Sequence, residues 1–240
     1  PHRLAWALGL GKIRLELNHL LTDPRAPFAD GYAAVVVATG LWEPIALGIP
    51  GENLTLNGIE FLRHPAAATV AGRTVVVVGG GATAFDCAMT ALRQGARRVE
   101  LCALETLAEM PLTKKEMTAL VASAVDVNGR LRLKSIEGQG GKIEALSTVK
   151  VRLRDGERFS LAALEELPGS EARRLDVNTV LVAIGLRSGF PRTADPRVIY
   201  AGDCVEGPTT VVEASAAGKN AAEQVCAVLQ ERPVPTFERN

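Results

Sequence analysis

The chain has 240 residues, of which 47% are hydrophobic and 22% charged, proportions typical of a globular protein. Its 27 Lys and Arg residues balance 27 Asp and Glu residues, which argues against binding to nucleic acid or a membrane surface because both need a basic field. The longest apolar runs have the length of a strand, well short of the roughly 20 residues of a membrane helix, and we expect a cytoplasmic protein.

Buried strands alternate with helices in the first half of the chain, a pattern that predicts an α/β fold with a parallel sheet. YAAVVVATG (32–40) predicts a strand that runs into a loop, and GRTVVVVGGG (72–81) predicts a second strand. ATAFDCAMTALRQG (82–95) predicts a helix that ends at a glycine, and RRVELCAL (97–104) predicts a third strand.

The pattern changes after Met117. GRLRLKSIEG (129–138) and STVKVRLRDGERFSL (147–161) alternate polar and apolar residues, which predicts a small antiparallel layer added to the parallel sheet. Asp155-Gly156 is the expected turn of a hairpin in this layer.

The last part of the chain returns to the first pattern. DVNTVLVAIG (176–185) predicts another strand that runs into glycine, and RVIYAGD (197–203) predicts a short final strand. Residues 208–230 are rich in helix formers and predict a long C-terminal helix.

A glycine pattern follows the strand at 72–81 directly. Gly79-x-Gly81-x-x-Ala84 lies between a predicted strand and a predicted helix, the setting that the dinucleotide-binding fingerprint requires. The glycines permit a tight turn and a close approach of the backbone to a pyrophosphate, and the helix start offers free N–H groups. The alternative is a glycine turn with a purely structural role.

A second pattern follows the last predicted strand. Gly202-Asp203 ends that strand, and a short loop leads to a helix that starts near Thr209 and Thr210. An Asp at a strand end can accept hydrogen bonds from a polyol, and a helix start stabilises negative charge. Taken alone, a Gly-Asp turn is common and more often structural.

Several motifs in fixed order carry a resemblance to a known family. The segments ATG (38–40), GxGxxA, AIG (183–185) and AGD (201–203) resemble the flavoprotein reductases with two dinucleotide-binding domains. More narrowly, GIPGE, VVVVGGGATAFDCAMTALRQGARRV, EMP and GDCVEGPTTVVEA are similar to the glutamate synthase small-subunit family. That family also includes the flavin modules of dihydropyrimidine dehydrogenase. The resemblance covers most of residues 30–228.

The resemblance implies two Rossmann-like dinucleotide-binding domains, with the nicotinamide domain inserted into a partial FAD domain. Residues 72–185 would form the NAD(P)-binding domain with its small antiparallel layer, and residues 1–71 and 186–240 would form the two parts of the FAD-binding domain. Hydride would pass from the nicotinamide to the flavin. Because the cofactors carry this chemistry, no catalytic residue is assigned.

The resemblance also implies which residues bind each cofactor. The pyrophosphate of the nicotinamide nucleotide would lie along Gly79, Gly81, Ala82, Thr83 and Ala84. The residues expected near FAD lie in three short segments, which are Ala38-Thr39-Gly40, Gly202-Asp203 at the ribityl-phosphate region, and Thr209-Thr210-Val211 at the pyrimidine edge. Gly185 is placed with the cofactor-binding residues as well.

Two features of the family are missing from this sequence. A second GxGxxG loop, which cradles the FAD pyrophosphate, and a cysteine-rich iron–sulfur segment precede the matched region in the family. We therefore expect the chain alone to bind FAD poorly, and a partner chain or a preceding segment to complete the site and carry the iron–sulfur clusters.

The cysteines predict neither a metal site nor disulfide chemistry. The four cysteines, at 87, 102, 204 and 226, form no CxxC, and no histidine stands near one at ligand spacing. Reduction of a disulfide is therefore disfavoured. His2, His19 and His64 are scattered, and we expect surface or packing roles for them.

The stretch after the third strand bears on the choice of nicotinamide nucleotide. The family usually has two arginines there, suited to the 2′-phosphate of NADP, where this chain has Leu104 and Glu105. A carboxylate accepts hydrogen bonds from a free ribose hydroxyl and repels a phosphate, which favours NAD over NADP. The alternative is that Glu105 is a solvated surface charge at a degenerate site.

The sequence thus predicts an FAD-dependent NAD(P)H oxidoreductase that passes electrons to an iron–sulfur or flavin partner. The alternative is a non-catalytic scaffold or assembly subunit with degenerate cofactor sites. The altered residues at Leu104 and Glu105 and the missing FAD loop favour this alternative.

Overall fold

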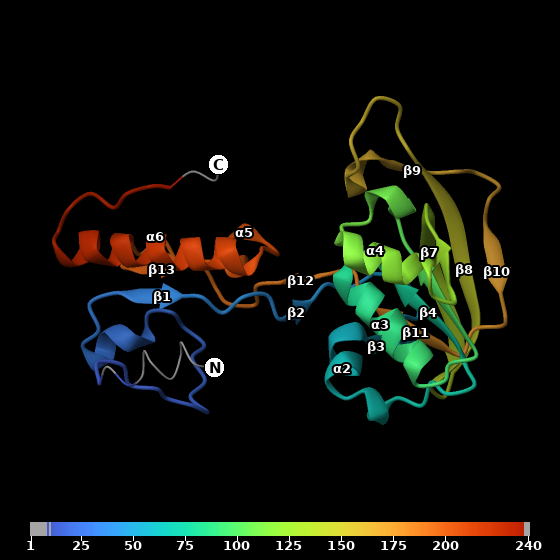
Figure 1. The fold of residues 1–240 in the computed structure, drawn as a ribbon, viewed down its shortest axis with the longest axis horizontal. Helices are drawn as coiled ribbons and strands as arrows, with labels where there is room; N and C mark the ends of the chain where they lie inside the picture. Colours follow the sequence, from blue (N-terminus) through green and yellow to red (C-terminus); the bar gives the residue numbers. More distant parts are fainter. Residues whose placement is uncertain (1–8, 10, 238–240) are drawn as a thin grey trace. The chain divides into compact units, whose positions relative to one another are not determined.

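The computed structural model describes residues 9 and 11–237, which form two compact units (Figure 1). Unit 1 consists of residues 1–43 and 187–240, and unit 2 consists of residues 44–186, so unit 2 is inserted into unit 1 along the chain. His2 lies outside the described residues. Two short strands, β2 (Glu43–Pro44) and β12 (Leu186–Arg187), pair where the chain passes from one unit to the other.

Unit 2 is built on a parallel sheet of five strands in the order β3-β11-β4-β5-β6. The central strand β4 (Thr74–Val78) reads TVVVV and is buried along its whole length, because both faces of the sheet are covered. The other strands are β3 (Leu56–Asn57), β5 (Arg98–Cys102), β6 (Val125–Asn128) and β11 (Thr179–Val182).

Three helices cover one face of this sheet (Figure 1). They are α2 (Gly58–Arg63), α3 (Ala82–Arg93) and α4 (Lys114–Val121). The buried face of α3 consists of Ala84, Cys87, Ala88 and Ala91, which recur at helical spacing. These side chains are small, and α3 therefore packs close to β4 and β5.

An antiparallel layer covers the other face of the sheet. It contains β7 (Leu131–Gln139), β8 (Lys142–Leu153), β9 (Leu164–Glu166) and β10 (Ala172–Arg174). Gly140 and Gly141, both at positive φ, make the tight turn from β7 to β8. The expected hairpin turn at Asp155-Gly156 lies in the connection from β8 to β9, which pair antiparallel, and this connection is long and contains η5 (Leu161–Ala163).

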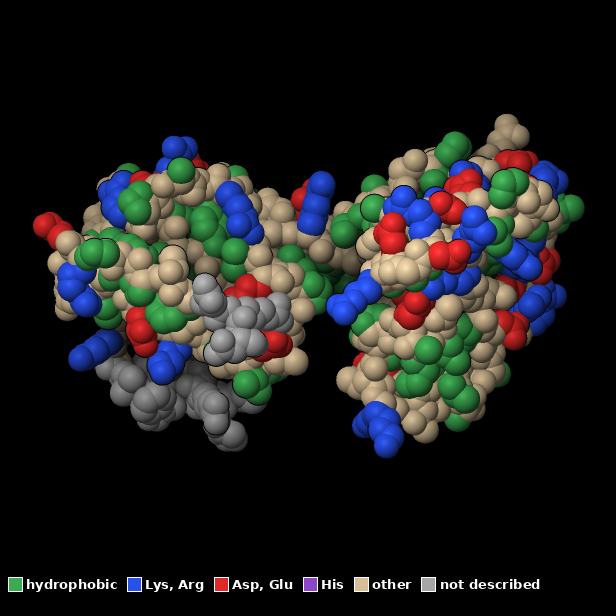
Figure 2. All heavy atoms as spheres, turned by 90° about the horizontal axis from the view of Figure 1, so that it is seen from above, with side chains coloured by type: hydrophobic (Ala, Val, Ile, Leu, Met, Phe, Trp, Pro, Cys, Tyr) green, Lys and Arg blue, Asp and Glu red, His purple; other side chains and the backbone are tan. Residues whose placement is uncertain are grey.

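Charged side chains of both signs intermingle on the surface of unit 2 (Figure 2). Many form pairs across the antiparallel layer, such as Lys134 with Glu166 at 2.8 Å and Arg173 with Glu137 at 2.6 Å. These pairs are exposed, and pairs of this kind contribute little to stability.

A buried carboxylate links the antiparallel layer to the parallel sheet. The Glu100 side chain in β5 is only 3% exposed and accepts hydrogen bonds from both terminal nitrogens of Arg174 in β10, at 2.7 and 2.9 Å. The Asn128 side chain donates a further bond of 3.1 Å to Glu100. The paired carboxylate raises the pKa of Arg174.

Residues 44–71 pack in unit 2, whereas the sequence placed residues 1–71 together in the FAD-binding part. The reason is that β3 pairs with β11 and that α2 packs against α3. Gly58 makes this packing possible, because a Cβ atom there would lie 3.0 Å from the Cys87 sulfur. The same stretch contains η2 (Glu52–Leu54) and η3 (Pro65–Ala67).

Unit 1 contains two parallel strands, β1 (Val35–Val37) and β13 (Val198–Tyr200). The long helix α6 (Val211–Leu229) packs against both strands through Ala217 and Ala221, which are buried with Ile199. Unit 1 also contains two shorter helices, η1 (Ala26–Asp30) and α5 (Asp203–Glu206). Over the described part of the chain, no helix has the length and apolar character needed to cross a membrane.

Candidate functional site

The glycine pattern lies at the end of β4, where the backbone passes between β11 and α3. Gly79 has a φ of 139°, and a Cβ atom there would lie 2.3 Å from the carbonyl oxygen of Ala183 and 3.2 Å from the Cβ of Ala84. A side chain at position 79 would collide with the backbone of β11. Glycine at 79 is therefore required by the fold itself.

The start of α3 is open. Gly81 is the N-cap, a Cβ atom there would have no described neighbour within 4 Å, and no described side chain caps the helix. The first N–H groups of a helix have no partner within it, so those of Ala82, Thr83 and Ala84 depend on other acceptors. Such a helix start can bind the phosphates of a nucleotide.

Glu105 lies beside the glycine loop. Its Oε2 atom would be 2.7 Å from a Cβ atom at Gly80, so the loop and this carboxylate are in direct contact. The Glu105 backbone is fixed, since its carbonyl accepts the Arg130 N–H at 3.3 Å. Within the described part of the chain, no hydrogen bond to the Glu105 carboxylate is present, which leaves both of its oxygens free to accept from a ligand.

Arg97 and Arg98 cannot reach this loop. Arg97 donates to the Thr74 hydroxyl at 2.9 Å, at the start of β4 and therefore at the end of the sheet opposite Gly79. Arg98 pairs with Glu100 and Asp126 on the same side. The two arginines that precede the third strand are thus engaged elsewhere, as the sequence indicated.

A second group of predicted residues meets in unit 1. A hollow of about 320 Å³ is lined by Ala38, Gly40, Gly202, Asp203, Thr209, Thr210 and Val211, all of which the sequence placed near FAD. Thr39 is not among the lining residues and is exposed. The sequence analysis did not include Val36, Ala201, Ala214 and Gly218, which also line the hollow. Two periodicities could have found three of these four residues, because 36 and 38 alternate on a predicted strand and 211, 214 and 218 share a helix face.

Two predicted FAD contacts already have protein partners. Asp203 Oδ1 accepts hydrogen bonds from the N–H of Thr209, at 3.2 Å, and from its hydroxyl, so this carboxylate fixes the loop before α6. Thr210 caps α6 together with Glu213 in a reciprocal capping box. These residues therefore shape the hollow, and the Oδ2 atom of Asp203 is the one with no hydrogen bond from a described residue.

Gly185 belongs to unit 2 and is not among the residues that line this hollow. It follows β11 with a φ of 115°, and its carbonyl accepts the Ile45 N–H at 3.2 Å. The carbonyl oxygen is therefore engaged in the short pairing that continues into β2 and β12. Gly185 is two residues from Ala183, the residue that contacts Gly79.

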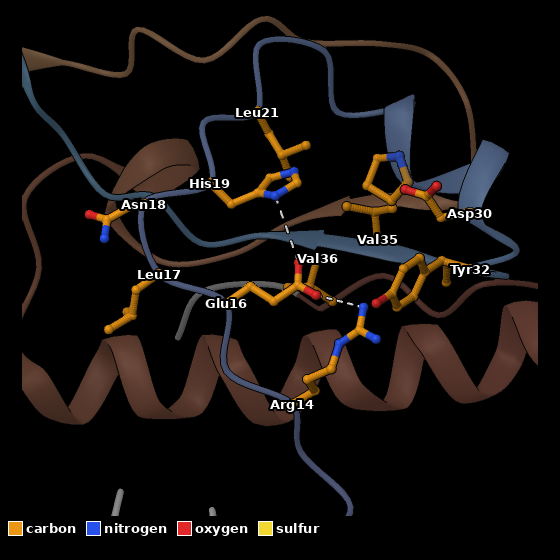
Figure 3. Close-up of a pocket in the computed structure, with 12 residues that line it drawn as sticks. Arg14, Glu16, Leu17, Asn18, His19, Leu21, Asp30, Tyr32, Val35 and Val36 are labelled. Carbon is orange, nitrogen blue, oxygen red and sulfur yellow. Dashed lines mark ion pairs between the residues drawn. The ribbon is translucent and has the colours of Figure 1, made fainter.

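A larger hollow, of about 910 Å³, lies beside β1 and the segment before it. Figure 3 shows the Glu16 carboxylate between the Arg14 guanidinium, at 2.6 Å, and the His19 ring, at 3.8 Å. The Glu16 carboxylate of this hollow is thus engaged by Arg14 and His19. None of the predicted cofactor-binding residues lines it.

The thiols are not arranged for redox or metal chemistry. All four cysteines are free, and three of them, Cys87, Cys102 and Cys204, are buried. Burial raises the pKa of both the Cys87 and the Cys102 thiol to about 12, which keeps them protonated. Among the residues that the structure covers, no group of His, Cys, Asp and Glu could hold a metal ion.

Comparisons with known proteins agree with this architecture. The sequence profile described as "Pyridine nucleotide-disulphide oxidoreductase" matches residues 10–218. The chain is 30% identical over 236 residues to the NADP(+)-dependent formate dehydrogenase subunit beta of Moorella thermoacetica, covering 86% of this chain and 33% of that protein. It is 24% identical over 254 residues to the glutamate synthase [NADPH] small chain of Escherichia coli, covering 88% of this chain and 52% of the relative.

The chain thus spans a third to a half of the length of these relatives. Among solved structures, thioredoxin reductase of Lactococcus lactis superposes with a TM-score of 0.62 at 16% identity, over 82% of this chain and 66% of that one. This likeness concerns the fold alone, and it confirms the expected α/β fold with two dinucleotide-binding domains.

Proposed function

The chain belongs to the pyridine nucleotide-disulphide oxidoreductase family, and from that premise we propose that unit 2 binds a nicotinamide nucleotide, NAD in preference to NADP. We propose further that unit 1 contributes to an FAD site, and that the whole is a flavin-dependent NAD(P)H oxidoreductase. Electrons would pass on to an iron–sulfur or flavin partner.

The observation that carries this proposal is the open start of α3. The helix follows a buried strand, its N-cap is Gly81, and the space beside that glycine is free of described atoms. The backbone N–H groups of Ala82, Thr83 and Ala84 would bind the pyrophosphate, helped by the positive end of the helix dipole.

Glu105 supports the preference for NAD. Its carboxylate touches the glycine loop at Gly80 and is free to accept hydrogen bonds from ribose hydroxyls. The same charge repels a 2′-phosphate. Both relatives named above carry NADP or NADPH in their names, so this preference would be a departure from them, located at Leu104 and Glu105.

The hollow in unit 1 supports an FAD-binding role. Its walls are small side chains and backbone at Ala38, Gly40 and Gly202, which allow a planar group to approach. The Oδ2 atom of Asp203 could accept a hydrogen bond from a ribityl hydroxyl. A nicotinamide and a flavin supply the hydride-transfer chemistry when both are bound. The residues of this chain bind and orient them. Both relatives are named as one subunit or chain of a larger enzyme, which supports a protein partner.

Calorimetric titration of the chain with NADH and with NADPH tests the nicotinamide site. We expect tighter binding of NADH, and in Glu105→Gln a loss of about tenfold in NADH affinity, the effect of one hydrogen bond to a charged group. Glu165→Gln, which removes a carboxylate from an exposed pair with Arg152, is the matched control.

The outcomes separate the alternatives. Tighter binding of NADPH than of NADH would refute the preference for NAD. Binding of neither nucleotide would refute the nicotinamide site and favour the scaffold subunit with degenerate cofactor sites. For unit 1, FAD titrated into the chain together with the partner chain or preceding segment that completes the site should bind at one equivalent, and Gly202→Val should abolish that binding.

A further inference from the structure

The segment that carries Glu105 is held in place by a partly buried ion pair. After β5, residues 104–106 lead into the short helix η4 (Leu107–Glu109), which starts with a capping box between Thr106 and Glu109. Glu109 Oε2 accepts from the N–H of Thr106 at 2.8 Å and from its hydroxyl at 2.9 Å. Its other oxygen, Oε1, accepts from Arg130 at 2.7 Å.

Arg130 reaches this segment from the turn between β6 and β7. Its backbone is in the left-handed region at a φ of 54°, and its N–H donates to the Glu105 carbonyl. One guanidinium nitrogen donates to the Leu104 carbonyl at 2.9 Å and the other to Glu109. The guanidinium lies 5.6 Å from the centre of the Phe159 ring, and the side chain is 20% exposed.

Arg130 is therefore a cation in direct contact with residues 104–109, the segment predicted to lie at the ribose. Among the described residues, all hydrogen bonds from Lys or Arg side chains to residues 104–109 come from it. A guanidinium in this place is the group that ordinarily recognises a 2′-phosphate. Here it is neutralised by Glu109, and the net charge that remains on the segment is that of Glu105.

We propose that Glu109 is a specificity-determining residue, which holds the Arg130 guanidinium away from the nucleotide and so makes this segment select an unphosphorylated ribose. This proposal rests on the proposed function, because it concerns the same nicotinamide site. Its chemistry is simple. Glu109 is ionised at neutral pH, since hydrogen bonds from Thr106 and the charge of Arg130 lower its pKa. Removing that charge leaves Arg130 without a carboxylate partner, while its bond to the Leu104 carbonyl keeps it at the segment predicted to bind the ribose.

The test is calorimetric titration of the full chain with four probes: NADH, NADPH, and the fragments 5′-AMP and 2′,5′-ADP. Glu109→Gln removes the charge and keeps an oxygen that can cap η4. We expect this variant to bind NADPH and 2′,5′-ADP about tenfold tighter than the wild type, as one charge-assisted hydrogen bond gives. Affinity for NADH and 5′-AMP should change little.

A second variant shows whether Arg130 causes the gain. Glu109→Gln with Arg130→Gln should lose it, and Gln has an unbranched stem that suits the positive φ no worse than Arg. Glu165→Gln, in the exposed pair with Arg152, is the matched control and should leave all four affinities unchanged. A thermal melt of each variant reports whether it is folded.

The results distinguish this inference from the proposed function. If the wild type binds neither dinucleotide, both are refuted. If the wild type binds NADH and Glu109→Gln leaves the ratio of NADPH to NADH affinity unchanged, the inference alone is refuted. The same holds if the gain persists without Arg130. A general loosening of the segment would weaken all four probes together and leave that ratio constant, which also refutes the inference.

Discussion

Each of the two units contains a strand, a glycine and the start of a helix. The two helix starts differ in whether a side chain caps their backbone N–H groups. In unit 2, α3 begins at Gly81 with no cap from a described side chain and with open space beside it. In unit 1, α6 begins at Thr210 with a full capping box from Glu213, and Asp203 fixes the preceding loop at Thr209.

This difference indicates which groups a ligand would meet in each unit. Uncapped N–H groups need an external acceptor, so α3 is suited to bind phosphate. At α6, Thr210 and Glu213 already satisfy part of the helix start. A ligand in the hollow beside it would meet small side chains, backbone and the Oδ2 atom of Asp203. Four changes would break or sharpen the comparison.

Gly79→Ala should have the largest effect. The added Cβ would lie 2.3 Å from the Ala183 carbonyl oxygen at a φ that only glycine adopts readily, so we expect unit 2 to lose about 4 kcal/mol of stability. Gly81→Ala is the control, since it has open space and a negative φ, and it should cost less than about 1 kcal/mol. Urea unfolding measures both. Equal losses would contradict the distinction between a structural and an exposed glycine.

Glu100→Ala tests the link between the two layers of unit 2. The variant removes the buried carboxylate and leaves Arg174 with Asp176, which is exposed, and we expect a loss of about 3 kcal/mol in the free energy of unfolding. Glu137→Ala breaks the exposed pair with Arg173 instead and should cost less than about 1 kcal/mol. Similar values for the two variants would show that burial does not set the strength of these pairs.

Thr210→Ala removes the cap of α6. We expect a loss of about 1 kcal/mol from helix capping, with unchanged binding of NADH, because this cap lies in unit 1 and the α3 site lies in unit 2. Thr210→Ser keeps the hydroxyl and should behave as the wild type. A parallel loss of NADH affinity in Thr210→Ala would contradict the assignment of the NADH site to unit 2 alone.

The smallest effect is expected in thiol labelling at pH 8. Cys226 is exposed and should react at once with a disulfide reagent, and Cys226→Ser should remove this fast phase. Cys87 and Cys102 should stay unreactive because their pKa values are raised to about 12. A raised thiol pKa stabilises the fold at low pH, and that contribution is lost as pH rises from about 9 toward 12. Rapid labelling of Cys87 or Cys102 would disprove the burial of these thiols in unit 2.

Much of unit 2 could be predicted because its signals are local. Three of these signals are the run of valines before Gly79, the alanines at helical spacing in α3, and the alternation of polar and apolar residues in β7 and β8. Each is a pattern among residues that are neighbours in the chain. The boundary of the unit could not be predicted, because it depends on β3 pairing with β11, more than 100 residues away along the chain. The turn from β7 to β8 at Gly140 and Gly141 was not predicted, whereas Asp155-Gly156 was predicted as a turn and lies in the connection from β8 to β9.

The sequence by itself determined the α/β fold, the order of the cofactor motifs and the carboxylate at 105, because strand periodicity and glycine spacing are properties of short segments. Only the tertiary structure decided which polar groups are free. It brings Glu105 to Gly80, commits Asp203 to Thr209, and pairs Arg130 with Glu109 across 21 residues of chain. The physical reason is that a polar side chain is free only when the fold brings no partner within hydrogen-bond distance of it. The spacing of residues along the chain does not say which partners the fold brings there.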